Sequence, residues 1–110
     1  MDKVMEDTVT ILKNAKDWLS DPQHWCRGQL WQWSKITGTL ERTCLIGATT
    51  IQVASKRSRI ASVSFISSKN AHELLDKAAL DLYERLPARV NDELGYDAAM
   101  KVLDFAISRS

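Results

Sequence analysis

Residues Leu40–Ala54 form the most restrictive stretch of the sequence, because as a helix they would be apolar on several sides. One helical face would carry Leu40, Cys44, Gly47, Ala48, Ile51 and Ala54. A helix that is apolar on several sides needs neighbours around it. Gly47 and Ala48 are too small to fill that space, so they predict a close approach by another backbone. We therefore predict a central buried helix, Leu40–Ala54, in a small bundle.

The totals of the sequence fit one domain, 1–110, with one core. Apolar residues make up 45% and charged residues 26%, as is typical of globular proteins. Fifteen Lys and Arg against 14 Asp and Glu give a net charge of +1, so no attraction to nucleic acid is expected from the overall charge. Because no signal peptide or apolar membrane span is evident, the predicted location is the cytoplasm, without membrane contact.

Three further helices are predicted from apolar residues at helical spacing. The first has an apolar stripe from Val4 to Leu19 and ends at Ser20-Asp21-Pro22. A second begins at Asn70, with Glu73 three residues later as a capping-box variant, and runs to Leu86 before Pro87. The last is capped by Asp97, and its buried stripe is Ala99, Val102, Leu103, Ala106 and Ile107. The fold class is thus mainly α, with about four helices.

Three of the four tryptophans, Trp25, Trp31 and Trp33, fall between the first and central helices. Leu30–Ser34 alternates as a short strand does, and we expect it to pair with the region of Ile60 in a two-stranded element. The rings either pack as a loop over the end of the bundle or form a binding surface, because Trp is enriched at recognition sites.

The two cysteines, Cys26 and Cys44, are predicted to be free thiols, because a reducing compartment disfavours a disulfide. Their number and spacing do not fit a structural zinc site, and His24 with Cys26 supplies too few ligands. We therefore expect neither a metal nor a cofactor.

Three motifs occur along the chain: Trp25-x-x-Gly28, Cys44-Leu-Ile-Gly-Ala48 and Asn91-Asp-x-x-Gly95. Together they resemble an uncharacterised family of small, mainly helical bacterial and phage proteins. Its members often show a Trp-Cys-Leu-x-Gly-Ala helix start and a later Trp-Asn-Asp-x-x-Gly turn. Thr43 and Val90 stand where that pattern usually has Trp. The resemblance implies a helical fold and the importance of the matching positions, but it implies no activity.

A cysteine enzyme is one functional alternative. A thiol at the first turn of a helix has a lowered pKa and is nucleophilic, as Cys44 would be if Thr43 caps the central helix. If Thr39 caps it, Cys44 is a small buried residue. His72 as a base, followed by Asn91 or Asp92 as the orienting residue, would complete a hydrolase or transferase site. The alternative for His72 is a solvated position in the first turn of its helix.

Asn91 and Asp92 also have a structural interpretation. Their side chains can build a turn, cap free backbone amides or bond the start of a neighbouring helix. Asp92 reaching Cys44 or a tryptophan indole would form a polar clamp between this loop and the central helix. We favour this interpretation over catalysis.

The favoured function is a non-enzymatic protein-interaction or regulatory module, with the Trp25–Trp33 region as its contact surface. The predicted partner is another protein, and a homo-oligomer is the alternative. The competing class is the small cysteine enzyme. A third class, nucleic-acid binding through Lys56, Arg57 and Arg59, has little support, because these charges lack interleaved aromatic residues.

Overall fold

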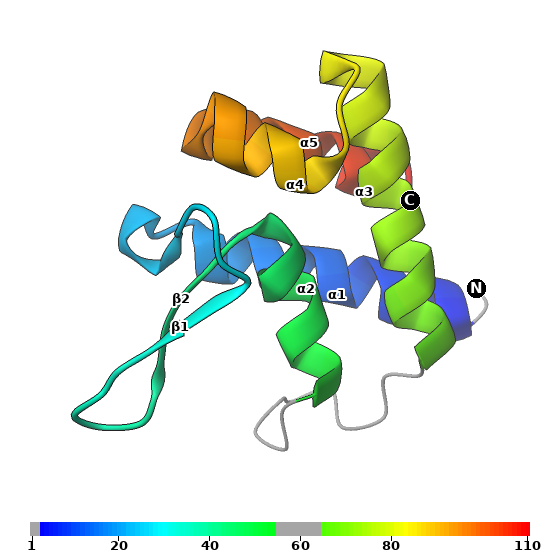
Figure 1. Ribbon diagram of the computed structural model, residues 1–110. Coiled ribbons are helices and arrows are strands. Elements are labelled where there is room, and N and C mark those ends of the chain that lie inside the picture. Colours follow the sequence, from blue (N-terminus) through cyan, green and yellow to red (C-terminus); the bar gives the residue numbers. More distant parts are fainter. Residues whose placement is uncertain (1–2, 55–64) are drawn as a thin grey trace.

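The computed structural model describes residues 3–54 and 65–110 (Figure 1). The elements follow in the order α1 (Lys3–Leu19), η1 (Pro22–His24), β1 (Trp31–Trp33), β2 (Leu40–Thr43), α2 (Leu45–Ala54), α3 (Phe65–Tyr83), α4 (Pro87–Arg89), η2 (Val90–Leu94) and α5 (Tyr96–Ser108). Here η1 is a 3-10 turn and η2 is a π-helical turn. The predicted class is confirmed, since the described residues form four long helices and a two-stranded sheet.

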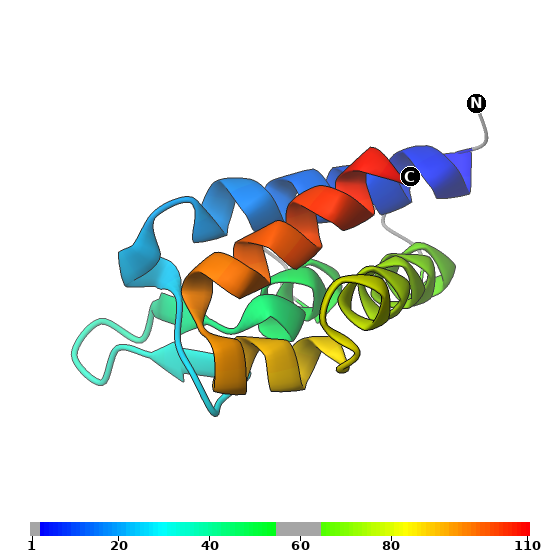
Figure 2. The ribbon, with the colours of Figure 1, turned by 90° about the horizontal axis from the view of Figure 1, so that it is seen from above.

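The arrangement of the four long helices depends mainly on α1 and α3. α1 and α5 run side by side in opposite directions, and α3 crosses them at one end (Figures 1 and 2). α1 and α3 each contact the three other long helices, whereas α2 packs mainly against α1 and α3. α1 and α3 therefore hold the central position that the sequence predicted for residues 40–54, and α2 packs against these two helices. No helix in the described ranges combines the length and the apolar character needed to cross a membrane.

The core is aliphatic and lies among the four long helices. α1 ends beside Asp21-Pro22 as predicted. The fully buried apolar side chains are Ile11, Leu12, Ala15 and Leu19 of α1, Leu45 of α2, Ala71, Leu75, Ala78 and Ala79 of α3, Val90 of η2, and Ala99, Val102, Leu103 and Ala106 of α5. The stripe predicted for the last helix is thus buried, with Ile107 partly covered.

The central segment is helical only from Leu45, so the predicted helix start was wrong. Leu40–Thr43 is the strand β2, antiparallel to β1, with Gln32 opposite Arg42. The Arg42 side chain donates to Gln32 Oε1 at 3.2 Å across this pair. β1 thus pairs with β2, and the Ile60 region, its expected partner, lies outside the described residues. A neighbouring strand satisfies the backbone here, a non-local effect that helical periodicity does not register.

Three other boundaries differ from the predictions. α3 begins at Phe65, so Asn70 lies inside the helix, and it ends at Tyr83, before Leu86. The residues after Leu86 form α4 and η2 instead of an open loop, because Pro87 at the first helical position starts a turn. α5 starts at Tyr96 with Gly95 as its cap, which places Asp97 in the first turn. The basic stretch 55–59 and most of 60–66 lie outside the described residues.

Candidate functional site

Asn91 is the centre of a buried polar network that joins three segments of the chain. Its Oδ1 accepts hydrogen bonds from Trp25 Nε1 at 2.6 Å and from the Leu45 amide at 3.0 Å. Its Nδ2 donates to the Cys26 carbonyl at 3.1 Å and to Asp92 Oδ1 at 3.0 Å. The side chain is fully buried and uses both lone pairs and both N–H groups. The predicted capping of a neighbouring helix start is confirmed, because Leu45 is the first residue of α2.

The Asn91 side-chain amide takes the place of one backbone hydrogen bond of a parallel β-ladder. Trp25 pairs with Thr43 as a parallel bridge, in which the Cys26 amide donates to the Thr43 carbonyl at 3.0 Å. The next bond of such a ladder would run from the Leu45 amide to the Cys26 carbonyl. Asn91 inserts between these two groups and satisfies both. One side chain thus fastens the loop after η1 to the start of α2.

Asp92 extends the clamp to the turn that follows Cys26. Its Oδ1 accepts from the Gly28 amide at 2.9 Å and from Asn91 Nδ2. The prediction that Asp92 clamps a tryptophan indole or Cys44 therefore named the wrong residue, because Asn91 makes the bond to the Trp25 indole. Asn91 contacts the indole, and Asp92 holds the turn.

Aromatic side chains cover the network on the outer side. Tyr96 meets the Trp25 ring edge-on, with 5.9 Å between the ring centroids, and the Arg27 guanidinium lies 5.6 Å from the centroid of that ring. Trp18 Nε1 donates to Thr43 Oγ1 at 3.1 Å, and the Trp18 ring stacks on the His24 ring with 3.8 Å between their centroids. Asn91 itself is fully buried, and burial strengthens the hydrogen bonds that its side chain makes.

Gly47 lies in close contact with the backbone at the start of the hairpin. A Cβ added there would lie 2.0 Å from the Leu30 carbonyl oxygen, so only glycine fits. The Leu30 carbonyl accepts from the Cys44 amide at 3.1 Å, and Trp31 Nε1 donates to the Gly47 carbonyl at 3.2 Å. The predicted close backbone contact at this small residue is confirmed.

Cys44 directly precedes α2, and its thiol is buried. The sulfur accepts from the Gly47 amide at 3.3 Å, within the first turn of the helix. Burial raises the pKa of Cys44, the backbone hydrogen bonds offset part of this effect, and the negative charge of Asp92 adds to it. The position therefore combines both sequence alternatives: the thiol lies at the helix start, and it is covered. A protonated, covered thiol is a poor nucleophile.

His72 lies on α3 and joins it to α2. Its Nε2 is 2.8 Å from Thr49 Oγ1 and 3.3 Å from Thr50 Oγ1, and burial lowers its pKa. The expected solvated position in a first turn was wrong, because α3 begins seven residues earlier and the ring is half-buried. Among the hydrogen bonds of the described residues, none connects His72 with Cys44. Asn91 has no bonding capacity left with which to orient a base.

The three predicted contact residues differ in exposure. Trp25 and Trp31 are half-buried, and their indole N–H groups bond within the molecule. Trp33 is 52% exposed on the hairpin that projects away from α3 (Figure 1). Ile36, at the turn of that hairpin, is 95% exposed and was missed by the sequence analysis. Its signal was an apolar residue inside a polar turn, Ser34–Gly38.

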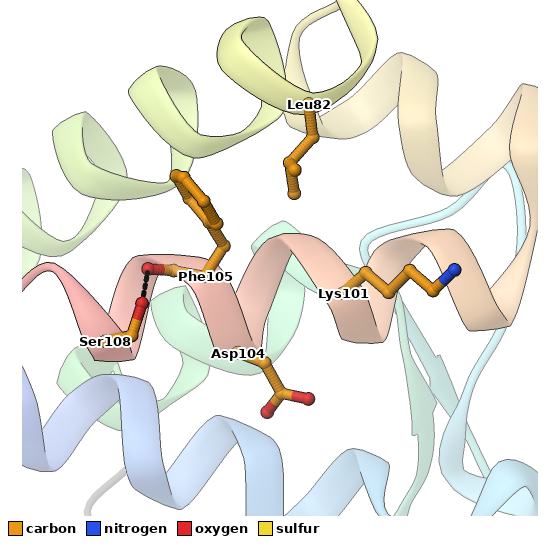
Figure 3. A pocket seen from close by; sticks show the side chains of 5 residues that line it. All are labelled: Leu82, Lys101, Asp104, Phe105 and Ser108. Atoms are coloured by element: carbon orange, nitrogen blue, oxygen red, sulfur yellow. Dashed lines mark hydrogen bonds between the residues drawn. The ribbon is translucent and has the colours of Figure 1, made fainter.

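An open groove lies between α3 and α5, on another part of the molecule (Figure 3). Its volume is about 360 Å³, and it is lined by Leu82, Lys101, Asp104, Phe105 and Ser108. Leu82 extends from α3 and Phe105 from α5 into the space between the two helices, while Asp104 points toward α1 and pairs with Lys16 at 2.7 Å. No group of three or more His, Cys, Asp or Glu side chains within 3–54 and 65–110 could hold a metal ion.

Comparison with known proteins gives one informative result. No curated protein and no solved structure matches the chain significantly. A family model does match, over residues 4–109, which is nearly the whole chain. The expected resemblance to a family without an assigned activity is confirmed at that level. The chain therefore belongs to a family of unknown function, DUF6197.

Proposed function

We propose that this protein is a non-enzymatic interaction module that binds another protein through the β1–β2 hairpin. One observation carries the proposal: a tryptophan and an isoleucine, Trp33 and Ile36, are 52% and 95% exposed on the same projecting hairpin. Leu30, at the base of the hairpin, is 45% exposed and adds to the apolar surface. Tryptophan is enriched among the residues that dominate binding energy.

The hairpin base supports this role because it is held from several sides. The Leu30 carbonyl bonds the Cys44 amide, and the Trp31 indole bonds the Gly47 carbonyl. Asn91 fixes the loop that precedes the hairpin, because its Nδ2 donates to the Cys26 carbonyl. A surface that is already ordered loses little conformational entropy on binding, so its contacts contribute more fully to affinity.

The partner should offer an apolar pocket for Trp33 and Ile36. Burying such a side chain contributes about 1.5–3 kcal/mol, so two of them supply much of the energy of a micromolar complex. The hairpin carries Lys35 and Arg42 against Glu41, a net charge of only +1, so the surface is not strongly charged. Apolar contact is therefore expected to dominate over electrostatic attraction.

Site-specific photo-crosslinking tests the proposal in cells that make the protein. A diazirine amino acid replaces Ile36, and a matched control replaces Lys77, which is exposed on α3. We expect a discrete crosslinked complex from position 36 alone, and we expect Trp33→Ala to abolish it without lowering Tm. A product with the mass of two copies would identify the partner as a second copy. The absence of any crosslink that depends on Trp33 would contradict the proposal.

A further inference from the structure

Cys26 and Cys44 are the two cysteines of the chain, and the fold brings their backbones together. Both are free and buried, with exposed fractions of 5% and 6%. Trp25 pairs with Thr43 in a parallel bridge, and the Cys26 amide donates to the Thr43 carbonyl. The next two residues in this register are Cys26 and Cys44. Each is therefore the first residue beyond the bridge on its own segment, just before the point where Asn91 enters.

Continued by one residue, this register predicts a spacing between Cys26 and Cys44 that suits a disulfide. Neighbouring strands lie about 4.8 Å apart, and residues at the same level of a parallel pair project to the same face. A disulfide joins Cα atoms that are about 4.4–6.8 Å apart. Burial is the main cause that raises the pKa of Cys26, and a thiolate at Cys44 is close enough to raise it further.

We propose that Cys26 and Cys44 form a reversible disulfide when the folded protein meets a small-molecule disulfide such as oxidised glutathione. Both sulfurs are held only by weak contacts, which rotation about χ1 can break. Cys26 donates to the Gln29 carbonyl at 3.4 Å, and Cys44 accepts from the Gly47 amide at 3.3 Å. This proposed disulfide is independent of the proposed protein binding through the hairpin.

Cys26 is the thiol that reacts first. It lies in a loop whose following residues, Arg27 to Leu30, are exposed, and the positive charge of Arg42 favours its thiolate. The Cys26 thiolate, having lost its proton to solvent, attacks one sulfur of oxidised glutathione. This step forms a mixed disulfide and releases one glutathione. The Cys44 thiolate then attacks the Cys26 sulfur, which forms the internal bond and releases the second glutathione.

The bond would close the chain at both ends of the hairpin. Cys26 precedes β1 and Cys44 follows β2, so the cross-link adds a covalent tie to the one that Asn91 makes by hydrogen bonds. Because a cross-link removes conformations from the unfolded chain, the oxidised protein should be more resistant to unfolding.

Incubation of the folded protein with oxidised glutathione tests this site without a partner. We expect the intact mass to fall by two hydrogens, both thiols to disappear together, and Tm to rise by about 5–10 °C. Dithiothreitol should reverse all three changes. In Cys44→Ser, the matched control, the Cys26 thiol should retain glutathione as a mixed disulfide, with no internal bond and no comparable rise in Tm.

Three results would overturn the proposal. The first is wild-type protein that collects glutathione on its cysteines or links to a second copy without an internal bond. The second is an internal bond that forms only after unfolding. The third is oxidised protein that melts below the reduced form. Failure of the hairpin crosslinking leaves these readouts unaffected, so the two proposals fail separately.

Discussion

The Trp25 indole N–H donates to Asn91 Oδ1 at 2.6 Å, a bond between residues 66 positions apart in the chain. The same oxygen accepts the first amide of α2, and the same side chain donates to the Cys26 carbonyl. A single amide therefore satisfies two donors and an acceptor that the chain would otherwise leave buried without partners. Buried polar groups of this kind are costly when they lose a partner.

Asn91→Ala should lower the free energy of unfolding by about 3 kcal/mol. The substitution leaves the Trp25 N–H, the Leu45 amide and the Cys26 carbonyl without their partner in a water-excluded site. Urea unfolding at neutral pH measures the change. Asn70→Ala, in the interior of α3, is the matched control and should change the free energy by less than about 0.5 kcal/mol. If both variants lost the same free energy of unfolding, the Asn91 network would not stabilise the fold in this way.

Gly47→Ala should lower the stability of the protein more than Gly38→Ala does, although Gly38 has a positive φ. At Gly47 the new Cβ would lie 2.0 Å from the Leu30 oxygen, so the hairpin must move, at a cost of about 3 kcal/mol. Gly38→Ala is the control. No atom lies within 4 Å of its Cβ position, and its φ of +69° costs only about 1–2 kcal/mol. Thermal unfolding of both variants makes the comparison, and the reverse order would contradict this account of the contact.

Much of the fold was predictable from local patterns, and the parts that were not depend on distant partners. The stripe of α1, its end at Pro22 and the close contact at Gly47 follow from spacing and residue size. The pairing of β1 with Leu40–Thr43 does not, because the sequence of those residues also fits a helix. The role of Asn91 as a cap was predictable, but its insertion between Cys26 and Leu45 depends on segments placed by the whole fold.

His72 should make the protein less stable as the pH falls. Burial lowers its pKa in the folded state, so the unfolded chain binds more protons once the pH drops below the ordinary histidine value of about 6.5. Its contribution is present above that pH and is lost as the pH falls toward the folded pKa. Urea unfolding between pH 7.5 and 5 should show a steeper loss in wild type than in His72→Gln. Parallel pH dependences would contradict this.

Cys44 should react slowly with alkylating reagents while the protein is folded. The Cys26→Ser variant leaves it as the sole thiol, and its raised pKa and burial should make iodoacetamide at least about tenfold slower than with the unfolded chain. Timed alkylation read by mass spectrometry gives both rates. Rapid reaction of the folded protein near neutral pH would instead favour the cysteine-enzyme alternative.

The coupling between Trp25 and Asn91 tests the clamp most directly. A double-mutant cycle with Trp25→Phe, Asn91→Ala and the combined variant, read by urea unfolding, isolates the energy of their interaction. The account predicts a coupling energy of about 1–2 kcal/mol, because the second substitution removes a bond that the first has already broken. Losses that simply add, with a coupling energy near zero, would show that this hydrogen bond does not hold the loop to the rest of the fold.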